Sequence, residues 1–316
     1  MPLITGSGGV ITPPPPFVQS SGPVPLGLTY VDPDGQAWAL ADYTSGNVAL
    51  NFAGIGGPLP AFTTLGLSTG GAIPQQYIAA IRTIVMQVII WDDDQTAFLG
   101  RLDAWAKALW CQRSGSPSPG MFIVSRPDGS SRQIEAYCTV GANQPDDDGT
   151  KSGRLWSTFT LTFQATDPFW SDADPIVIEF AAVPSGAGVP PMPPVILAPA
   201  TVLGDTTVTN SGDSDAYPLW TIFGPGTPTL SNTTTGRQFG LANAIGSGDW
   251  IQIDTRPTQQ SVVDQDGANQ WADLVESNPR DLWQLIPGDN ALDMALAGSG
   301  TGSKIVMSYT RRWLRS

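Results

Sequence analysis

The most informative absence in this chain is histidine, which does not occur among its 316 residues. Histidine is the most common general base, a frequent zinc ligand and the usual partner of a serine or cysteine nucleophile. Its absence argues against zinc hydrolases and against catalysts built on a Ser-His or Cys-His pair. Two carboxylates could still hydrolyse a glycosidic bond, so the acidic groups need separate consideration.

Four acidic groups are the remaining candidates for catalysis, and all of them lie in loop or turn contexts, where turn chemistry alone explains aspartate. We therefore predict no catalytic residue, no metal site and no cofactor. The second group could touch calcium, but the acidic residue that completes an EF-hand loop is missing. The groups are Asp92–Asp94, Asp146–Asp148, Asp172 with Asp174, and Asp213 with Asp215.

Cysteine is nearly absent as well, occurring only at Cys111 and Cys138. Two isolated thiols form no disulfide framework, and their separation in sequence is too long for a local metal clip. Cys138 alternates into the apolar side of a predicted strand, and Cys111 follows Trp110. The sequence thus predicts two buried free thiols and no disulfide.

Basic residues are scarce, with 15 Lys and Arg against 28 Asp and Glu, for a net charge of −13. Such a chain lacks the excess of positive charge with which DNA-binding proteins contact the phosphate backbone. The one basic cluster, Arg311, Arg312 and Arg315, is interpreted as a solvated tail. No apolar run is long enough to span a membrane, and residues 1–5 lack the basic start of a secretory signal. We expect the protein to fold in a cytoplasm.

Residues 81–170 form the stretch around which the chain is organised. Residues 81–91 are rich in β-branched side chains with almost no polar alternation, which predicts a strand covered on both faces. An acidic turn follows, and from Gln95 apolar residues recur every three to four positions, which is typical of a helix of about four turns. These residues are Phe98, Leu102, Trp105 and Leu109.

Two further strands and a turn complete this region. Residues 121–125 and a return strand flank the turn at 126–129, with Ile134, Ala136, Cys138 and Val140 on one side. Residues 155–163 alternate again, with Leu155, Phe159, Leu161 and Phe163 directed inward. The pattern predicts an α+β domain, with one helix on an antiparallel sheet.

The flanking segments differ in composition. Residues 1–25 are rich in glycine and proline and predict a flexible arm, either disordered or ordered on a neighbouring subunit. The sequence predicts short strands with turns over residues 26–52 and a long loop over residues 52–71. After Trp170 a proline-rich connection at 184–199 leads to many short strands with Gly and Asn turns, which predict a two-sheet antiparallel sandwich. The predicted strands lie at 175–183, 206–210, 219–223, 227–231, 237–241, 250–255, 261–264, 283–286, 291–296 and 304–309, with one helical turn at 271–277.

The order of strand, helix, hairpin and strand, ending in Asp-Pro-Phe-Trp at 167–170, resembles the N-terminal belt domain of phage distal tail proteins. The second half continues the resemblance over roughly residues 25–315. It does so at Asn-Ser-Gly (210–212) and at residues 217–225, 248–255, 283–290 and 309–313.

The resemblance implies three segments: an arm at 1–25, a ring-forming belt domain at 26–170 and a galectin-like sandwich at 171–316. It further implies a structural virion protein of the phage tail and not an enzyme. The expected partners are identical copies in a hexameric ring, the tail-tube protein, and baseplate hub, tip or fibre proteins. An apolar strand with two hydrophobic faces also favours self-association, which closes naturally into a ring. A ring this acidic would repel DNA passing through it, which we state as a hypothesis.

A second class of function remains open, a carbohydrate-binding adhesion module that contacts a host-surface glycan. Sugar sites combine exposed aromatics with polar side chains, and Trp250, Trp271 and Trp283 have polar neighbours. Trp250 and Trp283 lie in strand patterns where core packing is the default. Of the three tryptophans, Trp271 is the one for which the sequence pattern least favours packing in the core.

Overall fold

The computed structural model describes residues 27–42, 44–66, 69–141, 155–181, 201–257, 259–276 and 282–316. The chain divides into two compact units, one reaching Trp170 and including Leu314–Ser316, the other comprising Ser171–Trp313. The last three residues therefore belong with the first unit, whereas the sequence prediction placed them in the second domain. The predicted arm, the acidic group at 146–148 and the proline-rich connection lie outside the described residues.

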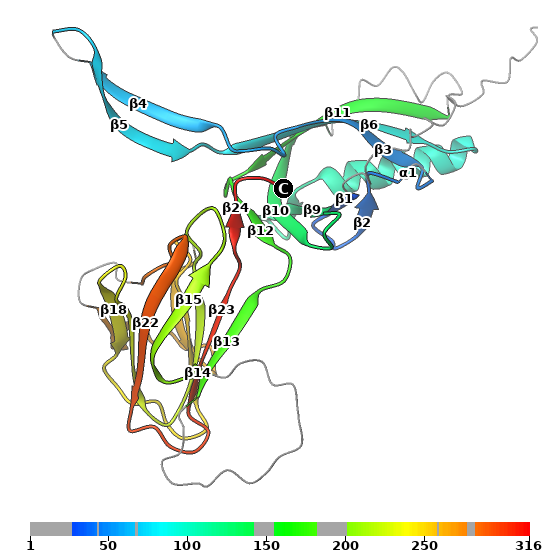
Figure 1. Ribbon diagram of the computed structural model, residues 1–316. Coiled ribbons are helices and arrows are strands. Elements are labelled where there is room, and N and C mark those ends of the chain that lie inside the picture. The colour runs from blue at the N-terminus through cyan, green and yellow to red at the C-terminus, as the bar shows by residue number, and fades with distance from the viewer. Residues whose placement is uncertain are drawn as a thin grey trace, which may run out of the picture. The chain divides into compact units, whose positions relative to one another are not determined.

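The first unit contains an antiparallel sheet and one helix (Figure 1). The sheet confirms the predicted hairpin, the predicted final strand and the short strands predicted for residues 26–52. Its order is β2 (Ala37–Ala39), β1 (Gly27–Val31), β9 (Gly120–Ser125), β10 (Ser131–Val140), β11 (Trp156–Ala165), β6 (Arg82–Trp91) and β3 (Asn47–Ala53). The short strands β12 (Trp170–Asp172) and β24 (Arg312–Trp313) pair with each other, and all their residues except Trp170 belong to the second unit.

Strand β6 is less covered than predicted. Its side chains alternate along the strand: Ile84, Met86, Val88 and Ile90 are buried, whereas the opposite side is only half-buried. Helix α1 packs against β6. Among the described residues, the second face of β6 is not fully covered, so the prediction of a strand covered on both faces is not met there.

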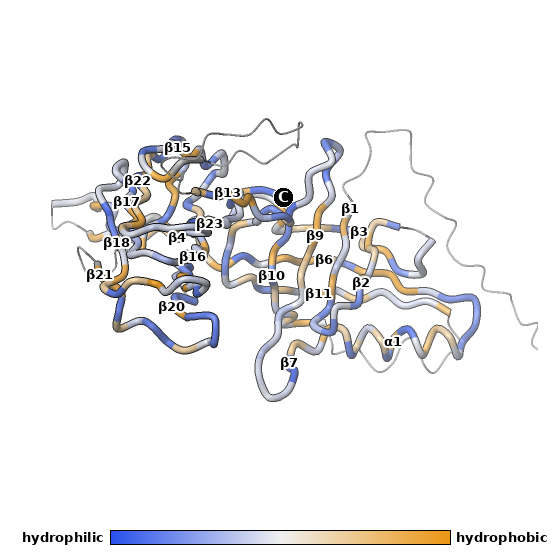
Figure 2. The backbone as a smooth tube through the Cα atoms, turned by 90° about the horizontal axis from the view of Figure 1, so that it is seen from below, coloured by the Kyte–Doolittle hydropathy of each residue, from blue (hydrophilic) through white to orange (hydrophobic). Residues whose placement is uncertain are grey.

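Helix α1 (Gln95–Leu109) confirms the predicted helix. Asp94 caps its first turn, because its Oδ2 accepts a hydrogen bond from the Ala97 amide at 2.9 Å. Phe98 and Trp105 are buried against the sheet, while Leu102 is half-buried. Along α1, polar and apolar positions alternate in Figure 2, as expected for a helix with one buried side. No helix in the described part of the chain is long and apolar enough to cross a membrane.

The segment predicted as a long loop contains half of a β-hairpin instead. Strand β4 (Pro60–Gly66) pairs with β5 (Ala72–Ala79), and the two pair with no other strand among the described residues. The hairpin extends away from the rest of its unit (Figure 1). Most of its described side chains are exposed on both faces, so no polar and apolar alternation marks it in the sequence. The turn between the strands includes Gly70 and Gly71, both with positive φ.

Two smaller corrections concern the sheet and the helix exit. Val140, predicted to point inward, is 57% exposed, because the register of β10 shifts between Cys138 and Val140. After α1 the chain forms a small hairpin of β7 (Gln112–Arg113) and β8 (Ser116–Pro117), with Ser114 and Gly115 at positive φ.

The second unit is a sandwich of a six-stranded and a five-stranded sheet, which confirms the predicted two-sheet architecture. Except for the parallel pair β13 and β14, neighbouring strands are antiparallel. The first sheet has the order β14 (Thr201–Val202), β13 (Ile176–Ala181), β23 (Lys304–Tyr309), β16 (Leu219–Phe223), β19 (Trp250–Asp254) and β20 (Ser261–Asp264). The second has the order β15 (Gly204–Asn210), β22 (Gly288–Ala297), β17 (Thr227–Asn232), β18 (Arg237–Leu241) and β21 (Leu274–Glu276).

The core of the sandwich lies between its two sheets. Trp220 and Ile253 from the six-stranded sheet meet Leu230 and Phe239 from the five-stranded sheet, all fully or almost fully buried. Two local predictions need correction. Residues 283–286 form no strand, only an isolated bridge between Leu285 and Ala216, and the predicted helical turn shortens to the 3-10 helix η1 (Trp271–Asp273), followed directly by β21.

Candidate assembly surfaces

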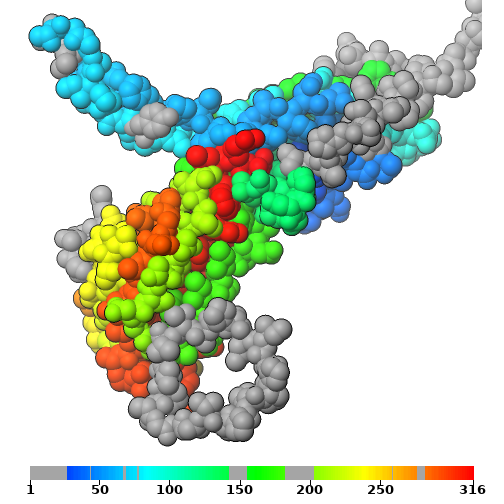
Figure 3. Space-filling model, viewed as in Figure 1, coloured from blue at the N-terminus to red at the C-terminus, as the bar shows by residue number. Residues whose placement is uncertain are grey.

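The β4–β5 hairpin presents apolar side chains on a segment that carries no charge. No Asp, Glu, Lys or Arg occurs between Asp42 and Arg82. Figure 3 shows the hairpin as an arm standing clear of the rest of its unit. Its exposed large apolar side chains, with exposed fractions of 49–77%, are Leu59, Phe62, Leu65, Ile73 and Ile78. Isolated exposed apolar residues are ordinary, but a contiguous apolar surface marks an interaction site.

The register of the hairpin places part of this apolar surface on one side. Leu65 lies opposite Ile73 and Ala61 lies opposite Ile78, and the two pairs share a face because β4 side chains alternate. Within the described residues, the outer edges of β4 and β5 carry no ladder pairing. Proteins ordinarily protect such edges with charges, proline or cover. Pro60 and Pro74 lie in the two strands, but charge is absent, so the hairpin has the apolar chemistry of a surface suited to cover by another chain.

The base of the hairpin is held by the buried side chain of Arg82, which is only 2% exposed. Its guanidinium donates to the carbonyl oxygens of Pro168 (2.6 Å), Gly54 (2.6 Å), Leu314 (2.9 Å) and Gly56. It also lies over the ring of Trp170, 5.9 Å from the centroid. Burial lowers the pKa of Arg82, and nearby Asp167 opposes that shift. The arm is therefore anchored to the interior of its own unit.

The incompletely covered sheet face is a second candidate surface. Trp91 of β6 lies directly opposite Trp156 of β11, and Ile89 lies opposite Thr158. These four side chains are half-buried. Gln87, next along the same face of β6, adds an amide and no charge. The face therefore offers partly exposed aromatic and β-branched side chains on which a neighbour could pack.

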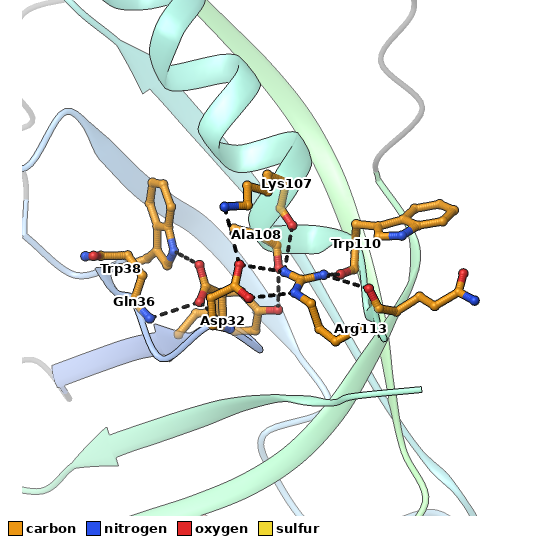
Figure 4. A network of polar contacts seen from close by, with 10 residues as sticks. Asp32, Gln36, Trp38, Lys107, Ala108, Trp110 and Arg113 are labelled. Carbon is orange, nitrogen blue, oxygen red and sulfur yellow. Dashed lines mark hydrogen bonds and ion pairs between the residues drawn. The ribbon is translucent and has the colours of Figure 1, made fainter. Parts of the chain in front are cut away.

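A polar network fixes the helix exit to the β1–β2 turn (Figure 4). Arg113 binds both carboxylate oxygens of Asp34, at 2.7 and 3.0 Å, and also donates to the carbonyls of Lys107 and Trp110. The Arg113 hydrogen bond is the main cause that holds the pKa of Asp34 below its ordinary value. These bonds satisfy carbonyls that the helix leaves free at its end.

Four of the described acidic candidates, Asp92, Asp94, Asp172 and Asp215, have structural partners. Asp92 forms an ion pair with Arg101 at 2.9 Å, and Asp94 caps α1. Asp215 accepts a hydrogen bond from Gln284 at 3.4 Å. Within the described ranges no group of three or more His, Cys, Asp or Glu side chains could hold a metal ion.

The basic cluster near the C-terminus is not the solvated tail that the sequence predicted. Arg311 pairs with the buried carboxylate of Asp172 at 2.6 Å, and Trp313 donates to the other oxygen of that carboxylate at 2.7 Å. The carbonyl of Arg315 accepts a hydrogen bond from Arg132 at 2.5 Å. Sequence reasoning missed these contacts because the partners are far away in the chain.

The three tryptophans of the sugar-binding alternative have different environments. Trp283 is buried in the sandwich core and donates to the Leu230 carbonyl at 3.1 Å, which removes it as a sugar platform. Trp271 is 42% exposed. Trp250 lines a pocket of about 200 Å³ together with acidic and amide side chains. The polar lining residues are Asn243, Asp249, Asp264, Gln265, Gln270 and Asp273.

Several polar groups of this pocket are already paired with one another. Asn243 donates to Asp273 at 2.7 Å, and Gln270 donates to Asp264 at 2.7 Å. Gln265 donates to Asp249 at 3.1 Å. The pairs orient the side chains around an aromatic wall, an arrangement suited to a neutral polyhydroxylated ligand.

Comparisons with known proteins place the fold among phage baseplate components. No family model matches the chain, and no curated protein matches it. Among solved structures, the crystal structure of SPP1 Dit (gp 19.1), described as a paradigm of the hub adsorption apparatus in Gram-positive infecting phages, has a TM-score of 0.61 at 13% identity and covers 92% of this chain and 99% of that chain. The phage P2 baseplate in its activated conformation with Ca has a TM-score of 0.53 at 9% identity, covering 92% and 99%. The corresponding structure with Sr has a TM-score of 0.53 at 9% identity, covering 93% and 100%.

Proposed function

We propose that this chain is a structural protein of a phage tail that assembles as a closed ring, a hexamer, at the distal end of the tail tube. The ring would join the tail-tube protein to baseplate hub, tip or fibre proteins, and the second unit, a galectin-like sandwich, would form its outer platform. The protein would act in the virion tail by geometry, without catalysis. The likeness of its fold to phage Dit and baseplate structures over more than nine-tenths of the chain supports this proposal.

The single observation that carries the proposal is the charge-free apolar hairpin β4–β5. A two-stranded ribbon is at best marginally stable alone in water, and this one leaves Leu65 and Ile73 exposed side by side. A second copy of the chain is the occupant we propose for it. The half-buried face of β6 and β11 is a second surface on which a neighbouring subunit could pack. Each subunit therefore has a projecting apolar arm and a sheet face that is not fully covered. Such unlike surfaces, joined head to tail, generate rings when the rotation closes.

Light scattering on the purified chain tests the proposal. The wild-type protein should elute as one closed oligomer, and the double variant Leu65→Asp, Ile73→Asp should elute as a folded monomer, because two charges on the arm oppose burial against a neighbour. Val177→Asp is the matched control, since Val177 is exposed to a similar degree (56%) in the second unit. A wild-type oligomer that persists unchanged in the arm variant would refute the role of the hairpin.

The pocket beside Trp250 supports a second candidate function, recognition of a carbohydrate on a host surface. Its aromatic wall and oriented carboxylates and amides suit stacking against a sugar ring and hydrogen bonding to hydroxyls. A glycan array with the whole protein tests this function. Binding that is lost in Trp250→Ala and retained in Trp271→Ala would assign the pocket. An array without binding would reject this alternative and leave the structural proposal untouched.

A further inference from the structure

The two cysteines, 27 residues apart in the sequence, meet at one place in the first unit. The backbone amide of Cys138 donates a hydrogen bond to the sulfur of Cys111 at 3.2 Å. Both side chains are half-buried and both are free thiols. The sequence predicted two buried free thiols; both are free, but they are only half-buried. The turn after α1 brings residue 111 back against the end of β10.

The surroundings make this pair accessible to a small solute. Cys111 and Cys138 line one open cavity of about 290 Å³, whose rim includes the exposed side chains of Trp110 and Val140. Each thiol donates one long hydrogen bond, with 3.5 Å between the sulfur and a carbonyl oxygen. Cys111 donates to Leu109, and Cys138 donates to Val140. No strong bond holds either sulfur in its present rotamer.

The geometry also allows a direct bond between the sulfurs. Because the N–Cα bond is about 1.46 Å long, the Cys111 sulfur lies within about 4.7 Å of the Cys138 Cα. A disulfide needs Cα atoms about 4.4–6.8 Å apart, and the closeness of the Cys111 sulfur to the Cys138 backbone is compatible with that range. Rotation about the side-chain bonds would then bring the two sulfur atoms together. The register shift between Cys138 and Val140 interrupts the regular ladder there, so this end of β10 can adjust to the cross-link.

We propose that Cys111 and Cys138 form an oxidisable dithiol site, which a small-molecule disulfide such as oxidised glutathione converts into an intramolecular cross-link between the exit of α1 and β10. The Cys111 thiolate attacks one glutathione sulfur, forms a mixed disulfide and releases one glutathione. The Cys138 thiolate then attacks the Cys111 sulfur and releases the second glutathione. The two protein thiols lose two electrons, oxidised glutathione gains them, and the two thiol protons end on the two released glutathiones.

The order of attack follows from the environments of the two thiols. Burial is the main cause that raises the pKa of Cys138 to about 12, and the thiolate is the nucleophile in thiol–disulfide exchange. Cys138 therefore reacts poorly with a disulfide from solution. It can still attack a mixed disulfide held beside it, because the reacting atoms are then already in place. This proposal is independent of the assembly role.

The test uses the full-length wild-type protein, which has no other cysteine. After incubation with oxidised glutathione, the denatured protein should be lighter by two hydrogen atoms, should carry no titratable thiol and should run as a monomer on a non-reducing gel. Its thermal midpoint should rise by about 5–10 °C and return on reduction. Two attached glutathiones, a cross-linked dimer or two surviving thiols would each overturn the proposal.

Single variants separate the two roles. Cys138→Ser should take up one glutathione at Cys111 and retain it, whereas Cys111→Ser should react at least tenfold more slowly at Cys138. Neither variant should form the internal bond. Equal rates of glutathione uptake in the two variants would contradict the assigned order, and the wild-type mass measurement decides the cross-link even if one variant fails to fold.

Discussion

Arg82 donates a hydrogen bond from Nη2 to the carbonyl oxygen of Leu314 at 2.9 Å, across 232 positions of the chain. The same guanidinium binds the carbonyls of Gly54 and Pro168. Arg82 lies at the start of β6, and its buried guanidinium joins three segments: the base of the hairpin at Gly54, the segment before β12 at Pro168 and the last residues of the chain at Leu314. The arm projects from a base that is fixed by long-range contacts within its unit.

Arg82→Ala should destabilise the first unit by about 3 kcal/mol or more, because several backbone carbonyls lose a charged donor and stay buried. Urea unfolding followed by tryptophan fluorescence measures the effect. Arg237→Ala is the control: Arg237 is exposed and donates to Gln284 at 3.1 Å, so its loss should change stability by less than about 0.5 kcal/mol. Equal effects of the two variants would show that the Arg82 network is not structural.

Acid should weaken the contact between Asp34 and Arg113. The folded-state pKa of Asp34 is lowered, first by the Arg113 hydrogen bond, so the carboxylate contributes stability above its unfolded pKa of about 3.9. That contribution is lost as pH falls through the lower, folded pKa. The thermal midpoint of the wild type minus that of Asp34→Asn should be constant from neutral pH to about pH 5 and shrink below about pH 4. A difference that stays constant to pH 2 would contradict this assignment.

Two glycines at the hairpin base form a matched pair for substitution. Gly54 has φ of +87°, and an added Cβ would lie 2.0 Å from the Thr83 carbonyl oxygen, whereas a Cβ on Gly56 would meet nothing within 4 Å. Gly54→Ala should cost about 2–3 kcal/mol, from left-handed strain and a backbone clash. Gly56→Ala should be near neutral. Thermal melts of the two proteins check the contrast, which would fail if both variants melted alike.

The second unit depends on a buried amide at Asn290, which is fully buried. Its side chain donates to the carbonyls of Ile286 (2.8 Å) and Gly288 (3.0 Å) and accepts from the Ile286 amide (3.0 Å). Asn290→Leu should destabilise the sandwich by about 2–4 kcal/mol, because those backbone groups lose their partners. Asn243→Ala, at an exposed amide, is the control for chemical denaturation. A neutral Asn290→Leu would show that water replaces the amide.

Elements with their own buried side could be predicted from the sequence. Helix α1 and strands β16, β18, β20 and β23 lie where the sequence pattern indicated, because each buries apolar side chains against a core that the chain itself supplies. The hairpin β4–β5 could not be recognised in that way. Its side chains meet no core in the single chain, so nothing imposes a period of two on the sequence.

The candidate surfaces were predictable only in part. The apolar character of residues 81–91 predicted a strand covered on both faces and, from its two apolar faces, self-association. Within the described residues one face of β6 is buried and the other is only half-buried. The role of Arg82, the pairing of Asp172 with Arg311 and the meeting of Cys111 with Cys138 were not visible. Each joins residues that the fold brings together from distant positions, and a pattern read within a short window carries no such information.

Negative-stain imaging of the purified protein at high micromolar concentration tests the central claim most directly. We predict closed rings of uniform diameter with a central opening, and their loss in the Leu65→Asp, Ile73→Asp variant. Isolated particles of single-chain size in the wild-type sample, or open filaments without closed rings, would contradict the proposal that this chain is a ring-forming subunit.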